Sequence, residues 1–509
     1  MNNRSIGVLR RFALAVLVSL LAAASLAQAQ DSIRIALPGE GDTLDPAYMS
    51  YVNSFSVASN IYSGLVRYRP GTIELVPDLA TSWDISADGL TYTFHLRDDV
   101  VWQKGYGKFV AQDVVTSFER VLDPATGSRW QGELSNIASI TAPDDVTVVF
   151  SLKSPNAAFL HSVSAFRQGL ITNAKAVADA GDDYGREPVG TGAYELAEWV
   201  PGVQIVLKAN PDFYLGKPPI DTATFVVIAD ESVRMLALQR GEVDIAMNLT
   251  NPEIYKTLAT NPNISTGEVT TSSAHGININ TRMAPFDDVR VRQALYYALD
   301  RDLIAEVIWG GLATPAYSDL APAYLGHTTD VPRYTYDPEK AKALLAEAGY
   351  PNGFKTTIYW LNTLSNELLG AVRAMWKDIG VDAEARVVDA GTWVATIGSG
   401  EAPLIVSLAP RADPDVWYSS FFHSRAFPPG LNGTYYDKVD ELIDAGRLES
   451  DPAKRAEIYA EIQRHVMADL PYLPLYWPKH AHPYWNYVKG WDGRQQYDAW
   501  LFPVSVEQH

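Results

Sequence analysis

Histidines have the widest chemical range in this chain, because imidazole binds metal ions and transfers protons near neutral pH. Among the 9 histidines, only His480 and His482 have a spacing that places two metal ligands on one face of a strand. Two ligands without a third nearby make a weak metal site, so we expect no metal centre and no cofactor. His423 lies in an aromatic stretch and leaves an accessory ligand role open.

Motifs for nucleophilic catalysis and for phosphate binding are missing from the sequence. The absence of cysteine excludes disulfides, thiolate zinc sites, iron–sulfur clusters and cysteine nucleophiles. No G-x-S-x-G turn and no P-loop occur, and Gly39-x-Gly41 lacks the third glycine of a dinucleotide-binding turn. Carboxylates are too numerous to single out one acid–base pair. We therefore expect that the protein is not an enzyme, with a secreted hydrolase as the remote alternative.

The composition favours a globular protein that encloses a ligand. The chain has 509 residues, of which 47% are hydrophobic and 20% charged, so intrinsic disorder is excluded for most of it. Its 13 Trp, 27 Tyr and 16 Phe supply rigid contact area of the kind that lines ligand pockets. The formal net charge of -19 disfavours a protein that binds nucleic acid, because such proteins need a basic surface.

The first residues have the order of an export signal. Arg4, Arg10 and Arg11 precede an apolar run over residues 12–26, and an Ala-Gln-Ala triplet ends at Ala29. The run is about 15 residues long, short of the ~20 that span a bilayer, although an uncleaved membrane anchor is the alternative. We expect cleavage after Ala29, and the absence of cysteine excludes a lipoprotein anchor. The mature protein should be exported and soluble.

Strand and helix patterns alternate along the mature chain, which is typical of an α/β protein. The segments 90–96 and 146–152 alternate apolar and polar residues, as half-buried strands do. An opening strand is predicted over residues 32–37. A helix that begins near Asp113 lies between the two alternating segments.

Three helices in the second half of the chain have clear start signals. The segments 337–349 and 451–470 both begin with an Asp-Pro pair, which places an N-cap before a proline at the first helical position. The first segment ends in a glycine, and a proline follows the second, as expected where helices stop. A third helix is predicted from Val289 to about Leu303, and Asp287 could supply its cap.

Six ordered blocks of the sequence resemble the bacterial extracellular solute-binding proteins of family 5, the peptide/nickel/opine type that serves ABC importers. The most specific block, residues 80–102, has a tryptophan, an Asp-Gly turn, an alternating strand and an L-R-x-D-V-x-W tail in the family's register. The blocks span nearly all of the mature chain: residues 80–102, 111–120, 188–214, 238–244, 288–301 and 336–350.

The resemblance implies an α/β, two-lobed periplasmic-binding-protein fold (type II, large peptide-binding subclass) with an inserted subdomain in the first lobe. Two crossing strands would join the lobes, and the ligand would lie between them. The expected division is a signal peptide over residues 1–29, lobe I over 30–66, 185–272 and 476–509, the inserted subdomain over 67–184, and lobe II over 273–475.

The resemblance also implies a function, which is that of a periplasmic receptor delivering a small-molecule solute to the membrane subunits of an ABC permease. We expect a monomer that encloses a peptide-like or amino-acid-conjugate solute, such as an opine, and the expectation includes solutes that bear carboxylates. Other members of the family take different ligands, so a receptor for a metal chelate such as nickel, or for an oligosaccharide, stays open. His423 and the histidine pair motivate the first alternative, and the aromatic content motivates the second.

In the peptide binders of this family, an aspartate four residues before the proline of a lobe II loop pairs with the ligand's α-ammonium group. The matching residue here is Pro410, in the loop that includes Ala409, which departs from the peptide binders. Asp413 could take over this role, or it could be an N-cap or turn residue. Arg411 would favour a carboxylate, because a guanidinium pairs with that group through two hydrogen bonds, and its alternative is a surface arginine beside acidic neighbours.

Aromatic and acidic residues at other places complete the candidate ligand site. In lobe I they flank the Leu-Asp-Pro turn near residue 45, where cleft residues of the family fall, and one belongs to the inserted subdomain. In lobe II they follow the loop or end the strand over residues 356–360. Each could instead be a core or surface residue. The candidates are Glu40, Gly41, Tyr48, Tyr51, Trp130, Trp360 and Trp417.

Overall fold

The structure is a computed structural model that describes residues 32–72, 74–271, 274–409, 413–491 and 499–507. The predicted export signal over residues 1–29 lies outside the described residues. In the part of the chain that the structure describes, no helix combines the length and the apolarity that a membrane span needs.

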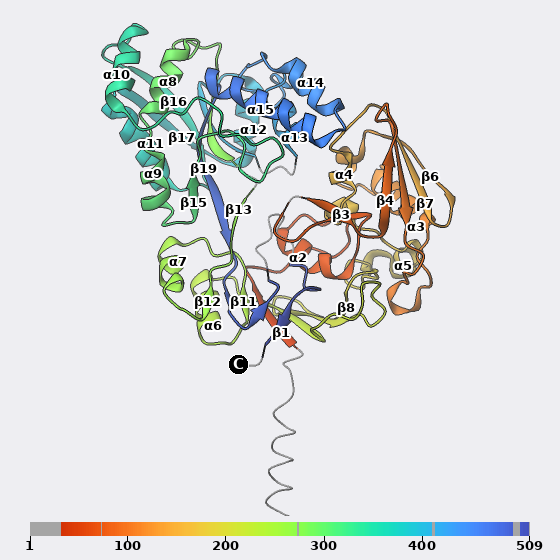
Figure 1. The fold of residues 1–509 in the computed structure, drawn as a ribbon. Helices are drawn as coiled ribbons and strands as arrows, with labels where there is room; N and C mark the ends of the chain where they lie inside the picture. Colours follow the sequence, from red (N-terminus) through yellow and green to blue (C-terminus); the bar gives the residue numbers. More distant parts are fainter. Residues whose placement is uncertain (1–31, 73, 272–273, 410–412, 492–498, 508–509) are drawn as a thin grey trace, which may run out of the picture.

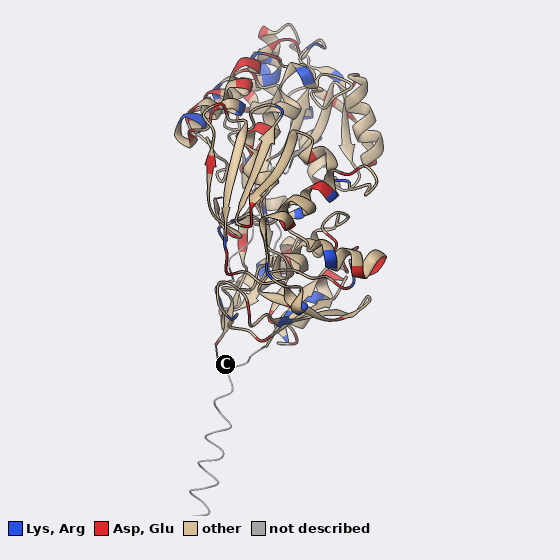
Figure 2. Ribbon diagram, turned by 90° about the vertical axis from the view of Figure 1, so that its right-hand side faces the viewer, with Lys and Arg blue, Asp and Glu red and all other residues tan. Residues whose placement is uncertain are grey.

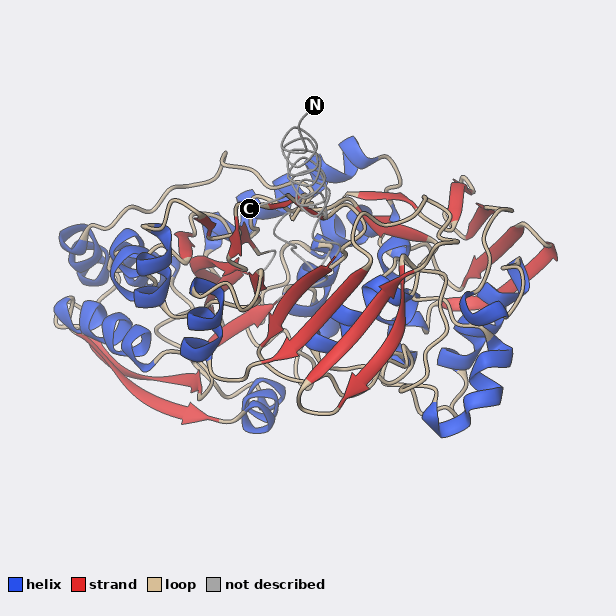
Figure 3. Ribbon diagram, turned by 90° about the horizontal axis from the view of Figure 1, so that it is seen from below, coloured by secondary structure: helices blue, strands red, loops and turns tan. Residues whose placement is uncertain are grey.

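The first of two large sheets has seven strands and forms the centre of lobe I. Its strand β1 (Ser32–Leu37) is the predicted opening strand, and it buries Ile33 and Ile35 completely. Strand β1 runs parallel to both of its neighbours, β10 and β11, whereas β8 and β9 form an antiparallel hairpin at one edge. Figure 3 shows the sheets in red with helices in blue beside them. The sheet order is β12 (Ile264–Ser265), β20 (Tyr484–Trp485), β11 (Ile245–Ala246), β1, β10 (Thr222–Val227), β9 (Gln204–Ala209) and β8 (Tyr194–Val200).

Three helices pack beside this sheet. Helix α2 (Val52–Ile61) lies beside β8, and α6 (Glu231–Gln239) lies beside β11. Helix α7 (Pro252–Ala259) lies beside β12. A short pair of strands lies near the C-terminus, β21 (Val488–Lys489) and β22 (Ser505–Val506). Val488 of β21 and Val504, the residue before β22, are buried in the same core.

A four-stranded antiparallel sheet extends lobe I on one side (Figure 1). Strands β5 (Thr91–Leu96) and β7 (Thr147–Leu152) confirm the two alternating segments, since both bury every second side chain. They are flanked by β4 (Ala80–Ile85) and β6 (Ile137–Asp144). Helix α3 (Ala111–Leu122) covers the sheet and begins two residues before Asp113, whose carboxylate accepts a hydrogen bond from the Val110 amide.

This sheet and the first one share a single hydrophobic core, so the four-stranded part belongs to lobe I. Smaller elements connect the two: strands β2 (Val66–Tyr68) and β3 (Leu75–Pro77), which form a hairpin, and helices α4 (Phe159–Ser162) and α5 (Ala174–Ala180). The predicted boundaries of the inserted subdomain at residues 67 and 184 stay a prediction.

The second large sheet also has seven strands and forms the centre of lobe II. Its strand order is β13 (Glu268–Thr270), β19 (Tyr472–Ala481), β14 (Ala274–Ile279), β18 (Leu404–Ala409), β16 (Phe354–Leu361) and β17 (Val381–Val388), with β15 (Ala313–Pro315) paired to β19. The helices of lobe II are α8 (Val289–Tyr297), α9 (Arg301–Leu303), α10 (Pro338–Glu347), α11 (Asn366–Asp378), α12 (Ala390–Ser399), α13 (Pro414–Phe421), α14 (Asp440–Leu448) and α15 (Pro452–Asp469).

Two of the three predicted helices are confirmed with their caps. Asp337 accepts a hydrogen bond from the Lys340 amide at the start of α10, and Asp451 accepts one from the Ala453 amide at the start of α15. A proline follows each cap at the first helical position, where its missing N–H costs no hydrogen bond.

The third predicted helix begins at Val289 as expected, but its cap and its end differ from the prediction. Helix α8 is capped by Asp288, which accepts from the Arg290 amide, and not by Asp287. It ends at Tyr297 instead of near Leu303, because Asp300 accepts a hydrogen bond from the Leu303 amide and so starts the separate short helix α9. A side chain that competes for backbone N–H groups in this way favours a new cap over helix continuation.

The polypeptide crosses between the two lobes twice, once from β12 to β13 and once from β19 to β20 (Figure 1). The crossing segments are paired with each other, since Glu268 lies opposite Ala481 and Thr270 lies opposite Lys479. Acidic and basic residues are interspersed over both lobes (Figure 2). The predicted α/β, two-lobed architecture is confirmed.

A candidate ligand-binding cleft between the lobes

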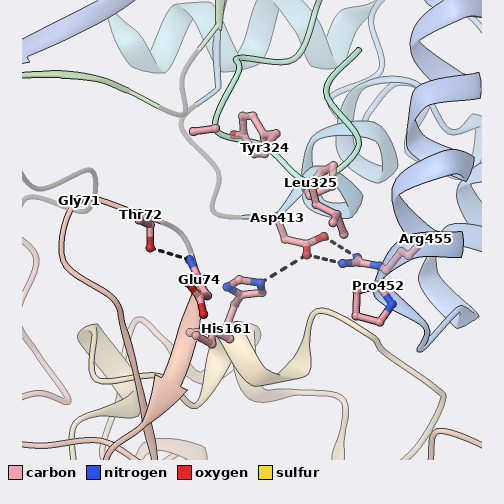
Figure 4. Close-up of a pocket in the computed structure, with 12 residues that line it drawn as sticks. Gly71, Thr72, Glu74, His161, Tyr324, Leu325, Asp413, Pro452 and Arg455 are labelled. Carbon is pink, nitrogen blue, oxygen red and sulfur yellow. Dashed lines mark hydrogen bonds and ion pairs between the residues drawn. The ribbon is translucent and has the colours of Figure 1, made fainter.

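A cavity of about 670 Å³ lies between lobe I and lobe II (Figure 4). Lobe I contributes the β2–β3 hairpin and helix α4, and lobe II contributes the segment 323–325 and the first turns of α13 and α15. Its volume is within the range of small-molecule sites. The lining residues are Gly71, Thr72, Glu74, Leu75, His161, Ala323, Tyr324, Leu325, Asp413, Pro414, Pro452 and Arg455.

A buried ion pair forms the lobe II wall of the cavity. Two nitrogens of Arg455 each donate to one oxygen of Asp413 at 2.7 Å, and the Asp413 side chain is 3% exposed. Burial alone would raise the pKa of Asp413, but the Arg455 guanidinium outweighs it and holds that pKa below its usual value. Asp413 also caps α13, accepting from the Asp415 amide at 2.8 Å. The helix cap therefore fixes the position of the Asp413 carboxylate, and the pairing with Arg455 stabilises its charge.

His161 reaches this ion pair from lobe I. Its Nε2 lies 3.5 Å from Asp413 Oδ2, and its Nδ1 lies 2.9 Å from the Tyr68 hydroxyl. The His161 and Tyr68 rings are stacked, with their centres 5.8 Å apart. Burial lowers the pKa of His161 below its usual value, although Asp413 acts in the opposite direction. A neutral imidazole in this position links the two lobes.

A second contact across the cleft lies close by. The Ala157 amide, just before α4, donates to the Arg447 carbonyl at 3.0 Å, on the last turn of α14. The Arg447 side chain lies 3.3 Å from Asp415, the residue whose amide Asp413 caps. Lobe I therefore touches α13 and α14 at neighbouring points.

The rest of the cavity wall is mostly apolar. Leu75 of β3 faces the segment 323–325, which contributes Ala323, Tyr324 and Leu325, and Pro414 and Pro452 complete the lining. The acidic side chain on the lobe I side, Glu74, pairs with Arg69 within the hairpin, at 2.6 and 2.9 Å.

Of the lobe II candidates from the sequence, Asp413 lines the cavity and occupies the N-cap position that was its alternative interpretation. Pro410 and Arg411 lie outside the described residues. Ala409 is the last residue of β18, where its backbone is paired with Ala274. The recognition role predicted for this loop thus stays a prediction.

The two lobe II tryptophans lie in hydrophobic cores. Trp360, on β16, is completely buried in the core that β16 and α11 share. Trp417, on α13, is 2% exposed and packs against Phe421 and Tyr472, with ring centres 4.8 and 5.3 Å away. The structure gives both side chains the packing role that was their alternative interpretation.

Glu40 and Gly41 lie in lobe I, away from the cavity lining. Glu40 accepts hydrogen bonds from the Trp199 indole at 2.6 Å and from the Gly202 amide at 2.8 Å, and so holds the β8–β9 hairpin. Gly41 lies against Ser54 on α2, where an added Cβ would come 2.3 Å from the Ser54 hydroxyl. A side chain does not fit there without movement of α2.

Tyr48, Tyr51 and Trp130 gather around the start of α2. The Trp130 indole donates to the Met49 carbonyl at 3.1 Å and packs against Phe55, with ring centres 6.4 Å apart. Tyr48 and Tyr51 are 42% and 61% exposed. These three predicted residues are brought together in lobe I, but none is part of the cavity lining.

The histidines with possible ligand roles are separated. His423 is buried beside Asp440 and Asp444 of α14, and its Nδ1 accepts from the Arg425 amide. His480 and His482 lie on and just after β19, where the lobes are joined. Within the described ranges, no group of three His, Cys, Asp or Glu side chains is placed to hold a metal ion.

Sequence reasoning missed His161, Tyr324 and Arg455 as cavity residues. Arg455 had a usable signal, because it falls on the same face of α15 as the buried Ile462 and Val466, where a charge requires a buried partner. His161 and Tyr324 lie in a short helix and a loop, which have no periodic pattern to mark them.

Comparison of the sequence with known proteins establishes which family the chain belongs to. The model for the bacterial extracellular solute-binding proteins, family 5 Middle, matches residues 74–428. The chain belongs to this family. Members are solute-binding proteins that deliver small molecules to ABC permeases, and the predicted receptor function is confirmed at this level.

Relatives with assigned ligands resemble this family 5 protein over most of its length. It is 30% identical to the dipeptide-binding protein of Escherichia coli (strain K12), covering 89% of this chain and 90% of the relative. It is 32% identical to the glutathione-binding protein GsiB of the same strain, with the same coverage. The structure of HbpA2 from Haemophilus parasuis is similar at a TM-score of 0.88 and 27% identity, covering 94% of this chain and 100% of that one.

Proposed function

We propose that this family 5 protein binds a peptide-like or amino-acid-conjugate solute, opine-like conjugates included, between its lobes and delivers it to an ABC permease. The observation that carries the proposal is the cavity of about 670 Å³ whose walls come from both lobes. The two relatives named above, each matched over about nine tenths of its length, bind a dipeptide and glutathione, which is itself a peptide. The cavity has room for a large part of a solute of that size.

Lobe movement explains how such a receptor works. A solute held by both walls stabilises the arrangement in which the walls are close, because only then are all its contacts made. Closing the walls also excludes water and strengthens the polar contacts inside. The permease can then distinguish loaded from empty protein by the lobe arrangement.

The proposal includes three finer statements. The solute is released unchanged, so the protein has no catalytic activity. It acts in the periplasm after cleavage following Ala29, without a lipid anchor, and it acts as a monomer. Intact-mass measurement of the exported protein checks the cleavage, and light scattering checks the monomer. A solute recovered in hydrolysed form after long incubation would contradict the first statement.

The decisive experiment is mass spectrometry of the small molecule that co-purifies with the exported protein and is released by denaturation. A peptide or amino-acid conjugate is the expected result. A metal chelate or an oligosaccharide would overturn the proposal. If the protein purifies empty, a thermal-shift panel of dipeptides, glutathione, opines, nickel chelates and oligosaccharides decides, since the bound class must raise the melting temperature.

A further inference from the structure

The charged groups that the structure describes on the cavity wall are already paired within the protein. Asp413 accepts from Arg455 through both oxygens and contacts His161, and Glu74 pairs with Arg69. The remaining nitrogen of Arg455, Nε, donates to the Gly446 carbonyl at 2.9 Å. A charged ligand group in this cavity would lose water and gain no unpaired counter-charge from the described lining, which is unfavourable.

The uncharged part of the wall offers contacts of another kind. Leu75 belongs to the lobe I lining and Pro414 to the lobe II lining. Tyr324, Leu325 and Pro452 stand on the lobe II side (Figure 4). Leu75 and Leu325 are only partly buried in the protein itself. Apolar surface that is left partly exposed on both walls gains free energy when an apolar group covers it.

We propose that this cavity is a subsite for an uncharged, apolar side chain of the bound solute, aliphatic or aromatic. The inference rests on the proposed function and adds a substrate class to it, namely peptides or conjugates with a hydrophobic side chain. The solute's amide and terminal groups are held elsewhere in the cleft. Burying one leucine-sized side chain corresponds to roughly tenfold to hundredfold tighter binding.

Isothermal titration with matched dipeptides tests the subsite. Leucine and asparagine have similar shapes and differ in polarity, so Ala-Leu is compared with Ala-Asn, and Leu-Ala with Asn-Ala. In at least one pair, the leucine peptide should bind at least tenfold more tightly. Lys-containing and Glu-containing dipeptides should bind no more tightly than the asparagine peptides.

Variants locate the preference in this cavity. Leu325→Gln and Leu75→Gln, on opposite walls, should each reduce the Leu/Asn ratio several-fold, and either variant suffices if the other fails to fold. Leu236→Gln on α6, where Leu236 is exposed and outside the cavity, is the matched control and should leave the ratio unchanged.

Each outcome has one meaning. Equal binding of leucine and asparagine peptides, or a leucine preference that both cavity variants retain, overturns the subsite and leaves the proposed function standing. If none of the dipeptides binds while a metal chelate or oligosaccharide raises the melting temperature, the proposed function itself is overturned. A leucine preference lost in a cavity variant and kept in Leu236→Gln supports the subsite.

Discussion

His161 Nε2 of lobe I lies 3.5 Å from Asp413 Oδ2 of lobe II, and this contact spans the cavity that we assign to the solute. Asp413 is held by Arg455 on the far side and caps α13. The contact therefore connects the position of lobe I directly to the framework of lobe II.

The His161 contact should make lobe separation depend on pH. Burial lowers the pKa of His161 in the contact. The charge of Asp413 opposes this shift, and the charge of Arg455 adds to it. The other ring nitrogen, Nδ1, forms a hydrogen bond with the Tyr68 hydroxyl. A base whose pKa is lowered in a contact keeps that contact while neutral and loses it as pH falls through its usual value of about 6.5. We expect a larger radius of gyration by X-ray scattering at pH 5.5 than at pH 7.5.

The variant His161→Asn serves as the control, because it removes the titrating ring. Its radius of gyration should be the same at both pH values. If the variant retained the pH-dependent change, another group would be responsible, and His161 would not be the sensor.

Breaking the buried pair on the lobe II wall should destabilise the fold strongly. Arg455→Met leaves the Asp413 carboxylate buried and unpaired, a change that costs about 3–5 kcal/mol in comparable sites. The melting temperature measured by circular dichroism should fall accordingly. The double variant Asp413→Asn/Arg455→Met should regain part of the loss, since it removes the buried charge and keeps an N-cap residue.

An exposed arginine provides the comparison for this change. Arg240 forms a 3.8 Å pair with Glu242 at the surface, and Arg240→Met should change the melting temperature little. A double variant less stable than Arg455→Met alone would contradict the account.

Because of the buried carboxyl of Asp319, the free energy of unfolding should fall as pH rises. Burial of the carboxyl raises its pKa to about 7. A carboxyl whose folded pKa exceeds its unfolded value of about 3.9 favours the folded state while protonated, so stability falls as pH rises from about 4 to 7. We expect Asp319→Asn to stabilise the protein at pH 8, by on the order of 4 kcal/mol at most, and to do little at pH 4.

Urea denaturation at several pH values measures this effect. Asp382→Asn, at an exposed position on β17, is the control and should show the wild-type pH dependence. A pH profile of Asp319→Asn parallel to that of the wild type would show that this carboxyl does not titrate as expected.

Three buried histidines near the lobe junction should instead make the folded protein less stable as pH falls. Burial lowers the pKa of His275, His480 and His482 to about 3, about 4 and about 3, so they are neutral when the protein is folded. The unfolded chain protonates them near pH 6.5, and stability is therefore lost as pH falls below that value. Each contributes about 1.4 kcal/mol per pH unit in that range.

The variant His482→Asn isolates one of these histidines. Its amide oxygen can replace Nδ1 as the acceptor of the Asn248 amide hydrogen, which now spans 2.9 Å. The free energy of unfolding falls with decreasing pH between pH 6.5 and 4.5. In this variant the slope of that fall should correspond to the uptake of about one proton fewer on unfolding. His465→Asn, at an exposed position on α15, should leave the slope unchanged. An unchanged slope in His482→Asn would contradict the assignment.

Much of the secondary structure can be predicted from residues that are close together in the sequence. The caps at Asp337 and Asp451 were predicted because a helix start is set by residues a few positions apart. The same reasoning placed the start of α8 at Val289 but chose the wrong cap, since Asp287 and Asp288 are equivalent as sequence signals and only the packed structure distinguishes them. The two-lobed arrangement came from the resemblance, because no local pattern encodes which sheets share a core.

The site was less predictable, because its contacts join distant parts of the chain. Glu40 was a reasonable ligand candidate until its partner Trp199, 159 residues away, was known. Asp413 was recognised as either a ligand group or a cap, and its bond to Arg455 required the position of α15. Aromatic type alone could not separate Trp360 in the core from the exposed Tyr51.

The pairing of β13 with β19 where the chain crosses between the lobes has a mechanical consequence. Because Glu268, Val269 and Thr270 are registered against the residues from Lys479 to Ala481, the two connections bend as one ribbon and cannot slide independently. Relative motion of the lobes then bends or twists both connections together. Chemically different solutes would drive the same motion, so one docking geometry on the permease can serve cargo that differs from one binding event to the next.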